Sequence, residues 1–323
     1  MAANGTAPET TLLGSIDDYL GPRARRFFGE GFKRAEHRIT DVRIDGGAVS
    51  AMATVDYPAD WSRKGDRDQR PHLSTVDVLV LGAWLAETQL AHTRGLTPAQ
   101  RADAVLIRAD IKAGTTPVEE ELRGFRVTAA APVATPTADG RVRSVIDCVI
   151  GTLTLRCEID HEPGVPNTAP AEFGSPEEIL GYEGLRLFAE GHRIRRQFVE
   201  GVSADVAGAT AGANVRIEGP DVALLSASAL TVDTFVVGLQ LGQVLLYELD
   251  SVSRARSDTL WMRRTVLTCE RPGEPRLPSG PVVFRLEKAK LLENSKGEVW
   301  RAADIVGEFQ GIRLRCSVAH RLP

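Results

Sequence analysis

The sequence is poor in cysteine and in aromatic residues and has no strong excess of either charge. Of its 323 residues only 4 are cysteines and 6% are aromatic, and 39 Lys and Arg stand against 43 Asp and Glu. A net charge of −4 leaves no electrostatic footprint for a nucleic-acid backbone, so we expect no nucleic-acid partner. The cysteines show no CxxC spacing, which excludes a typical zinc site or disulfide scaffold. We predict buried free thiols at Cys148, Cys157, Cys269 and Cys316, and neither metal nor cofactor.

Segments for secretion or membrane insertion are also lacking. The first 20 residues contain no basic stretch followed by a continuous apolar run, so no signal peptide is predicted. The most apolar window, from Thr231 to Leu249, carries Asp233, Gln240, Gln243 and Glu248. These polar groups make a bilayer span costly and favour a buried core helix. We expect a cytoplasmic protein that does not contact a membrane.

Size and composition are those of a folded protein with about two domains. The hydrophobic share is 43% and the charged share 25%, which argues against disorder, collagen and coiled coils. A chain of 323 residues gives a prior of two domains at roughly 100 to 200 residues each.

An internal repeat divides the chain. Three blocks recur in the same order, 160, 156 and 159 residues further on: Ile16–Gly21 with Arg26–Gly31 as Pro176–Gly181 with Arg186–Gly191; Thr75–Asp77 with Gly82 and Leu85 as Thr231–Asp233 with Gly238 and Leu241; and Leu153–Cys157 with His161 as Ile312–Cys316 with His320. Such self-similarity at a nearly constant displacement indicates duplication of one unit. We expect a first unit at 1–162, a linker at 163–175 and a second unit at 176–323.

Each unit is expected to contain one long helix and several strands. The helices are predicted at 73–91, with Ser74 or Thr75 as N-cap, and at 231–250. Both are apolar on nearly all sides, which is typical of a helix surrounded by protein. Alternation and turn residues predict strands at 38–57 (broken at 45–47), 104–113, 122–133 and 142–161, and at 191–205, 213–218, 258–270, 281–290 and 307–322.

A long buried helix after a hairpin, followed by antiparallel strands, is the pattern of the hot-dog fold. We therefore predict an α+β protein with two tandem hot-dog units, a double hot dog. Two separate α+β sandwiches remain the alternative, because strand order cannot be read from one sequence.

Nearly the whole chain resembles the avirulence protein D family. The resemblance is carried by Tyr19–Gly21, Phe28–Gly31, Tyr57–Pro58, Asp60–Lys64 and Pro71–Ser74 with Asp77, and by Leu239–Gln243, Leu245–Asp250, Ser253–Arg254, Thr259–Arg263 and Arg315–His320. It implies an enzyme of specialised metabolism that joins a 3-oxoacyl chain to the ketose xylulose to make a syringolide-type acyl glycoside or butenolide signal. Hot-dog proteins commonly bind acyl thioesters along the central helix, which supports this only by analogy.

The first unit has the richer set of candidate site residues. Before its long helix it carries Trp61, Arg63 and Lys64, which are suited to contact a charged or polyhydroxylated substrate. His72 precedes the helix N-terminus and could take a proton from a sugar hydroxyl or from the acidic carbon of a 3-oxoacyl chain. The backbone near Ser74 could stabilise the oxyanion, and Asp77 could orient His72. The alternatives are a solvated loop, a His72 that only bonds the loop, and an Asp77 that complements the helix dipole.

The second unit offers further polar candidates. Trp261 and Arg263 follow the second long helix, and Arg263 could face the groove between units and hold an anion. Gln240 and Glu248 are polar positions on that helix and could contact substrate. The alternatives are that Gln240 and Gln243 tie the helix to strands, and that Glu248 and Asp250 pair with Arg254 or Arg256. His161 and His320 recur in both units, which indicates a structural role.

Several functions fit these features. The first is an acyltransferase or condensing enzyme whose partners are 3-oxoacyl-CoA or a 3-oxoacyl-acyl carrier protein and a small sugar or sugar phosphate. The second is a hot-dog dehydratase or thioesterase, and the third is a non-catalytic module that binds acyl ligands. A homodimer is compatible with each. We expect one productive site per chain, because the second unit has no counterpart of the loop from Trp61 to His72.

Overall fold

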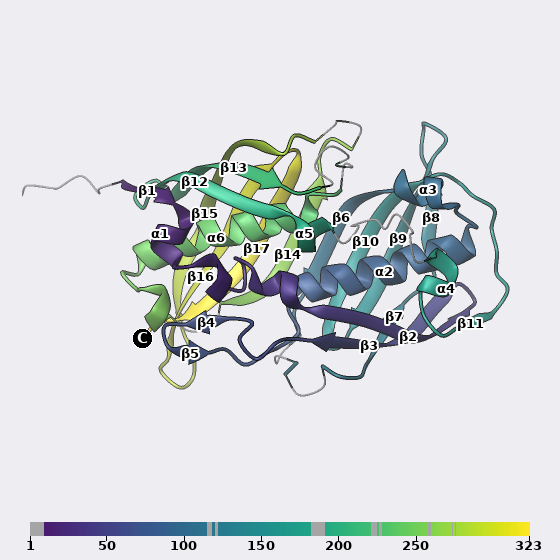
Figure 1. The fold of residues 1–323 in the computed structure, drawn as a ribbon, viewed down its shortest axis with the longest axis horizontal. Coiled ribbons are helices and arrows are strands. Elements are labelled where there is room, and N and C mark those ends of the chain that lie inside the picture. The colour runs from purple at the N-terminus through teal and green to yellow at the C-terminus, as the bar shows by residue number, and fades with distance from the viewer. Residues whose placement is uncertain are drawn as a thin grey trace, which may run out of the picture.

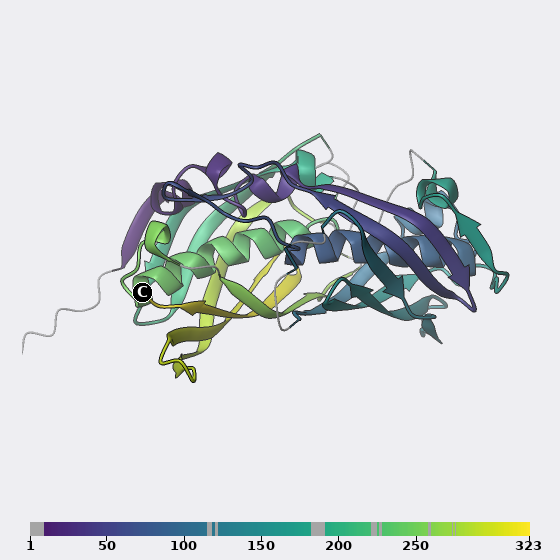
Figure 2. The same ribbon diagram turned by 90° about the horizontal axis from the view of Figure 1, so that it is seen from below.

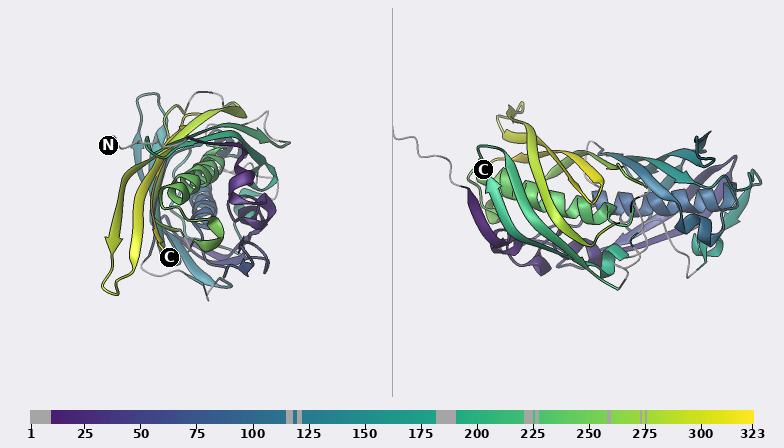
Figure 3. Two further views of the ribbon diagram at one scale, coloured as in Figure 1. Left: turned by 90° about the vertical axis from the view of Figure 1, so that its left-hand side faces the viewer. Right: turned by 90° about the horizontal axis from the view of Figure 1, so that it is seen from above.

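The computed structural model describes residues 10–114, 118–119, 122–181, 191–220, 225, 228–257, 260–272, 274 and 276–323. Its centre is formed by two helices of 19 residues, α2 (Thr75–Thr93) and α6 (Thr231–Leu249). They lie nearly end to end along the long axis of the molecule (Figures 1 and 2). An antiparallel sheet curves around both, as the view along that axis shows (Figure 3).

The sheet has 15 strands and runs through both halves of the chain. The strands of the first half are β2 (Glu36–Asp45), β3 (Ala48–Asp56), β6 (Val105–Lys112), β7 (Phe125–Ala129), β8 (Val133–Pro136), β9 (Val142–Ile150) and β10 (Leu153–His161). Those of the second half are β12 (Arg196–Asp205), β13 (Thr210–Glu218), β14 (Trp261–Cys269), β15 (Ser279–Glu293), β16 (Val299–Phe309) and β17 (Ile312–Arg321). Two short strands, β1 (Thr11–Ser15) and β11 (Ala171–Phe173), complete it.

The strand order shows how the halves join. It is β1-β12-β13-β15-β16-β17-β14-β6-β10-β9-β7-β3-β2-β11, with β8 paired to β9. The junction is β14 against β6, in a register from Arg264↔Lys112 to Thr268↔Arg108. One continuous sheet with two wrapped helices confirms the predicted double hot dog. The alternative of two separate sandwiches is wrong.

The sequence reading missed two strand breaks. The segments expected at 142–161 and 307–322 are each two antiparallel strands, β9 with β10 and β16 with β17. The chain reverses at Gly151 (φ 59°) and at Gln310 and Gly311 (φ 50° and 72°). Two successive positive φ values are those of a tight type I′ hairpin turn, which glycine adopts without strain. The segment expected at 122–133 is likewise reduced to β7, because the chain leaves the sheet before β8.

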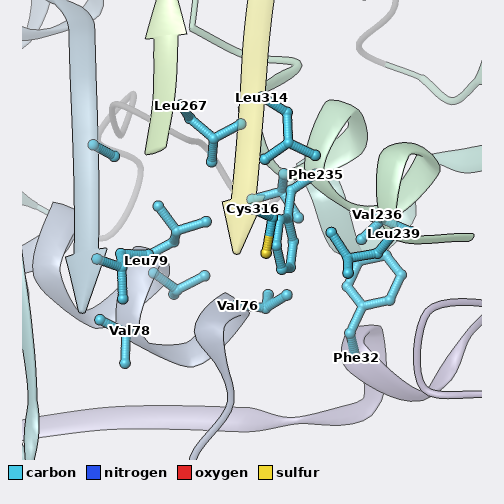
Figure 4. Packing of buried hydrophobic residues seen from close by; sticks show 14 of the residues in the cluster. Phe32, Val76, Val78, Leu79, Phe235, Val236, Leu239, Leu267, Leu314 and Cys316 are labelled. Carbon is cyan, nitrogen blue, oxygen red and sulfur yellow. The ribbon is translucent and has the colours of Figure 1, made fainter. Parts of the chain in front are cut away.

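Both long helices are buried, as predicted from their all-round apolar sequence. Helix α6 is long and apolar enough to cross a membrane, but 89% of that window is buried inside the protein. This is the environment of a core helix in a soluble protein. Figure 4 shows side chains of both helices in one cluster with Leu314 and Cys316 of β17. All four cysteines are free and buried, as expected.

Equivalent glycines let both helices approach the sheet closely. A Cβ atom on Gly82 would lie 2.2 Å from Leu155 Cδ2, and one on Gly238 would lie 2.5 Å from Leu314 Cδ2. Leu155 and Leu314 occupy matching positions on β10 and β17. The repeated glycines therefore reflect one packing requirement that both units share.

The halves exchange their leading segments. Strand β1 pairs with β12 of the second half, and α1 (Ile16–Leu20) packs on α6. Strand β11 pairs with β2 of the first half, and α4 (Glu177–Leu180) packs on α2. The units in space therefore differ from the intervals 1–162 and 176–323 at these segments, and β11 lies within the expected linker. The recurring block Arg186–Gly191 falls outside the described residues except for Gly191.

The exchange explains Glu248, which was expected to contact substrate. Its carboxylate accepts hydrogen bonds from Tyr19 Oη at 2.6 Å and Thr11 Oγ1 at 2.9 Å. The expected pairing with Arg254 or Arg256 is wrong as well. Glu248 instead ties the leading segment of the first half to α6 of the second half.

Candidate active site

The N-terminus of α2 is closed by a reciprocal cap. Ser74 is the N-cap, and its Oγ accepts a hydrogen bond from the Asp77 amide at 3.2 Å. The Asp77 carboxylate accepts one from the Ser74 amide at 2.6 Å. In the described part of the chain, no hydrogen bond satisfies the amides of Thr75 and Val76. Such orphan donors at a helix start can stabilise developing negative charge.

Asp77 is the centre of a buried hydrogen-bond network. Its carboxylate is 1% exposed and contacts His37 Nε2 at 2.8 Å and the Tyr57 hydroxyl. Burial by itself raises the pKa of Asp77, but the hydrogen bonds from His37, Tyr57 and Ser74 outweigh it and lower that pKa. Burial, followed by the nearby Asp77 charge, raises the pKa of Tyr57 well above its ordinary value.

Sequence reasoning missed His37, although the repeat contained a signal. The displacement of 160 that relates β2 to β12 sets His37 opposite Gln197. Gln197 Nε2 donates to Asp233 at 2.6 Å, just as His37 contacts Asp77. A polar residue at both positions, facing the first-turn Asp of its unit, is the pattern that would have identified the pair.

His72 makes no hydrogen bond to Asp77, so the idea that Asp77 orients it is wrong. The orienting contact is Nδ1 to the Arg70 carbonyl oxygen at 3.2 Å. A carbonyl only accepts, so Nδ1 carries the proton in the neutral ring and Nε2 presents a lone pair. The ring also meets Trp61 edge-on with centroids 5.4 Å apart. His72 is thus held in the tautomer that can act as a base at Nε2.

A cavity of about 190 Å³ opens at this helix N-terminus. Polar groups line one part of it and apolar side chains another. The lining residues are Gln69, Arg70, His72, Leu73, Ser74, Thr75, Ala113, Gly114, Val118, Glu119, Leu153, Leu260, Trp261 and Met262. The cavity therefore brings the expected base and helix N-terminus together with an apolar wall drawn from both halves.

The loop residues of the first half divide between lining and support. Trp61 is 2% exposed, its Nε1 donates to the Gln69 carbonyl at 2.7 Å, and it packs against Tyr57. Arg63 pairs with Asp68 at 2.8 Å across the hairpin of β4 (Arg63–Lys64) and β5 (Arg67–Asp68). Arg63 lines neither this cavity nor its neighbour and stabilises the loop.

A second, smaller cavity of about 70 Å³ adjoins the first. It shares five lining residues with the larger one: Gln69, His72, Ser74, Leu260 and Met262. The others are Arg26, Phe27, Phe28, Trp61, Ser62, Lys64, Gln243 and Arg254. Lys64 and Trp61 thus lie at this smaller cavity, where Arg26, Gln243 and Arg254 were not foreseen as neighbours.

Of the remaining second-half candidates, only Trp261 lines the larger cavity. Arg263 is exposed and lines neither cavity, because it points outward from the start of β14. Gln240 is buried and accepts a hydrogen bond from Arg26 Nη1 at 2.7 Å. It therefore fixes a lining residue and does not itself line either cavity.

Asp250 and His320 form a structural cluster at the other end of α6. Asp250 pairs with Arg301 Nη2 at 2.6 Å and His320 Nε2 at 3.1 Å, so the expected pairing with Arg254 or Arg256 is wrong. His161, the repeat equivalent of His320, contacts Ser144 Oγ at 2.8 Å and is fully buried. Both histidines have the structural role that their recurrence suggested.

The N-terminus of α6 is built differently. Its N-cap, Leu230, makes no side-chain cap. Asp233 pairs with Arg195 Nη2 at 3.0 Å, and this guanidinium is 1% exposed. The position 160 residues before Arg195 is Ala35. A buried ion pair thus stands at this helix start, where the first half has the His37 network and an open cavity. Within the described residues, no group of three or more His, Cys, Asp or Glu could hold a metal ion.

Comparison with known proteins places the chain in a family. A family model described as Pseudomonas avirulence D protein (AvrD) matches residues 11–323. The comparison with curated protein sequences finds no match.

Several solved structures are similar in fold. One is a tesB protein of Mycobacterium avium subspecies paratuberculosis, at 11% identity and a TM-score of 0.44, covering 85% of this chain and 93% of that one. Another is the dehydratase domain of RzxB from Pseudomonas fluorescens, at 17% and 0.35, covering 88% and 96%. A third is an acyl-ACP thioesterase from Bacteroides thetaiotaomicron, at 13% and 0.37, covering 84% and 98%. Likeness at these scores does not bear on the reaction of this chain.

Proposed function

Because the chain belongs to the Pseudomonas avirulence D protein (AvrD) family, we propose that it is an enzyme that joins a 3-oxoacyl thioester to a ketose such as xylulose. The product would be an acyl glycoside or a butenolide-type signal. The carrier of the acyl group would be CoA or an acyl carrier protein.

One observation carries this proposal: the larger cavity combines a base with orphan helix amides and an apolar wall. Leu73, Val118 and Leu153 offer the acyl chain a surface away from water. His72 and Thr75 lie at the polar part of the same cavity. A thioester seated with its chain on the apolar wall would have its carbonyl group near both.

The acyl-transfer step follows from these positions. His72 Nε2 takes the proton of a sugar hydroxyl, and the hydroxyl oxygen attacks the thioester carbonyl carbon. A C–O bond forms, and the negative charge on the carbonyl oxygen is stabilised by the amides of Thr75 and Val76 at the start of α2. The C–S bond then breaks, and the thiolate leaves with the proton returned by His72. The products are the sugar ester and the free thiol.

Asp77 and Tyr57 have a supporting place in this scheme. Neither lines the larger cavity, and both lie in the network beneath Ser74. By fixing the helix cap they hold the Thr75 amide in place. We assign them a positioning role rather than contact with substrate.

Product analysis of the purified protein tests the function. The protein is incubated with a 3-oxoacyl-CoA and a panel of ketoses, and products are identified by mass spectrometry. A sugar ester or its cyclised derivative supports the proposal. Release of the free 3-oxo acid without a sugar adduct would instead identify a thioesterase, and conversion of a 3-hydroxyacyl thioester to the enoyl product would identify a dehydratase. Binding without turnover would identify an acyl-ligand module.

The His72→Ala variant tests the assignment of the base. General acid–base catalysis contributes roughly 10²- to 10⁴-fold, so kcat should fall by that factor with little change in stability. The matched control is Ser228→Ala, 156 residues further on at the start of the second long helix, which should retain full activity. Near-normal turnover in His72→Ala, or equal losses in both variants, would show that the chemistry lies elsewhere.

A further inference from the structure

The smaller cavity has an unusual charge. Three basic side chains line it, Arg26, Lys64 and Arg254, and no carboxylate does so among the residues described. They come from three separate segments: the turn after the short 3₁₀ helix Arg23–Arg25, strand β4, and the 3₁₀ helix Arg254–Arg256. Buried positive charge is costly unless an opposite charge compensates it. The fold therefore concentrates cations where a negatively charged group would be stabilised.

Two of these cations are held firmly in place. Arg26 is 3% exposed, donates to Gln240 Oε1 at 2.7 Å and pairs with Asp17. Lys64 is 9% exposed, and its Nζ donates to Ser257 Oγ at 3.3 Å. These contacts fix the position of the positive charge before any ligand arrives, which reduces the ordering cost of binding.

Arg254 differs, because its charge is not neutralised by the protein. Its side chain is half-buried, and in the described part of the chain no carboxylate pairs with it. Burial lowers the pKa of Arg254. Burial also lowers the pKa of Arg26 to about 10 against the opposing charge of Asp17, and the neighbouring Arg254 adds to this lowering. Each shift has the sign expected where positive charge is in excess.

Size and position narrow the ligand. A volume of about 70 Å³ holds roughly five to seven water-sized spheres, enough for a phosphate group but not for an acyl chain. The smaller cavity shares His72 and Ser74 with the larger one. A group bound there would belong to a molecule that also reaches the proposed base.

We propose that the smaller cavity binds a phosphate group of a substrate and that Arg254 contacts it directly. Arginine suits this role because its planar guanidinium can donate two parallel hydrogen bonds to phosphate oxygens. The proposal rests on the proposed function for the identity of the substrates. The phosphate has two sources: a ketose phosphate, or the phosphopantetheine arm that carries the acyl chain.

Four substrate pairs separate these sources. Xylulose or xylulose 5-phosphate is combined with a 3-oxoacyl-CoA or with the corresponding N-acetylcysteamine thioester, which lacks phosphate. The variant is Arg254→Gln. The matched control is Arg256→Gln, because Arg256 lies in the same turn but is exposed and does not line the cavity.

A charged hydrogen bond to phosphate predicts an increase in KM of about 10- to 100-fold in Arg254→Gln, confined to the phosphate-bearing partner. An increase for xylulose 5-phosphate alone identifies a sugar phosphate, and an increase for the CoA thioester alone identifies the pantetheine arm. Arg254→Lys, which keeps the charge, should recover part of the loss. Unchanged KM values in all four pairs, equal increases for partners without phosphate, or the same loss in Arg256→Gln would overturn the proposal.

A binding measurement keeps the two proposals distinct. If no pair yields product, the proposed condensing function fails, but the cavity can still be tested by thermal denaturation with xylulose 5-phosphate or CoA. A ligand that binds only the folded state raises Tm. A rise in the wild type that is absent in Arg254→Gln supports the phosphate site, and no rise with either compound would refute it.

Discussion

Replacing Asp77 by Asn should destabilise the protein by about 3–4 kcal/mol. The carboxylate accepts hydrogen bonds from Tyr57 and the Ser74 amide and contacts His37. A hydrogen bond to a charged group contributes about 1.5–3 kcal/mol, against about 0.5–1.5 for a neutral one. Losing the charge on three such contacts gives a difference of about 3–4 kcal/mol, which agrees with the cost of breaking a buried ion pair.

Thermal and urea denaturation measure this loss. At about 2–4 °C per kcal/mol, the expected decrease in Tm is about 6–12 °C. The control is Asp45→Asn at the exposed end of β2, which should change stability by less than about 0.5 kcal/mol. Because the folded protein lowers the pKa of Asp77, its contribution is present above about pH 3.9 and lost as pH falls through the folded pKa. The difference between wild type and Asp77→Asn should therefore shrink in acid.

Activity decides between positioning and catalysis. Because Asp77 lines neither cavity, kcat measured well below Tm should fall by less than about 10-fold, far less than the roughly 10²- to 10⁴-fold expected for a lost acid or base. A fall in kcat of that larger size with an unchanged Tm would refute this reasoning and place Asp77 in the chemistry itself.

Two further predictions concern the core. Gly238→Ala should cost about 1–3 kcal/mol by overpacking, because the new Cβ would lie 2.6 Å from Phe284 Cε1, and urea denaturation should show a clearly lower midpoint; an unchanged or higher midpoint would mean that the ring moves freely. Burial lowers the pKa of His161 and of His320, so the stability each contributes is fully present above about pH 6.5 and falls as pH drops towards the folded pKa, by up to about 1.4 kcal/mol per pH unit for each histidine. Urea titrations between pH 7.5 and 5 should show a smaller slope in His161→Gln than in wild type, and equal slopes would contradict the assignment.

Much of the candidate site was accessible from the sequence. His72, Ser74 and Trp261 line the larger cavity as a group, and Trp61 and Lys64 line the smaller one. These residues flank the two long helices, where a loop before a helix start has few structural alternatives. Arg63 and Arg263 were plausible by residue type alone. Their partner or outward direction depends on a hairpin and a strand register that one sequence does not specify.

The sequence by itself determined the duplication, the two buried helices and the cap at Ser74, because each depends on spacing or on residues a few positions apart. The tertiary structure alone decided which polar groups meet. Asp77 finds His37 from 40 residues away, and Glu248 finds Tyr19 from 229 residues away through the exchange of leading segments between the halves. The physical reason is that a buried polar group takes its partner from whichever segment the sheet order places beside it. That order is set by the packing of the whole chain and not by local sequence.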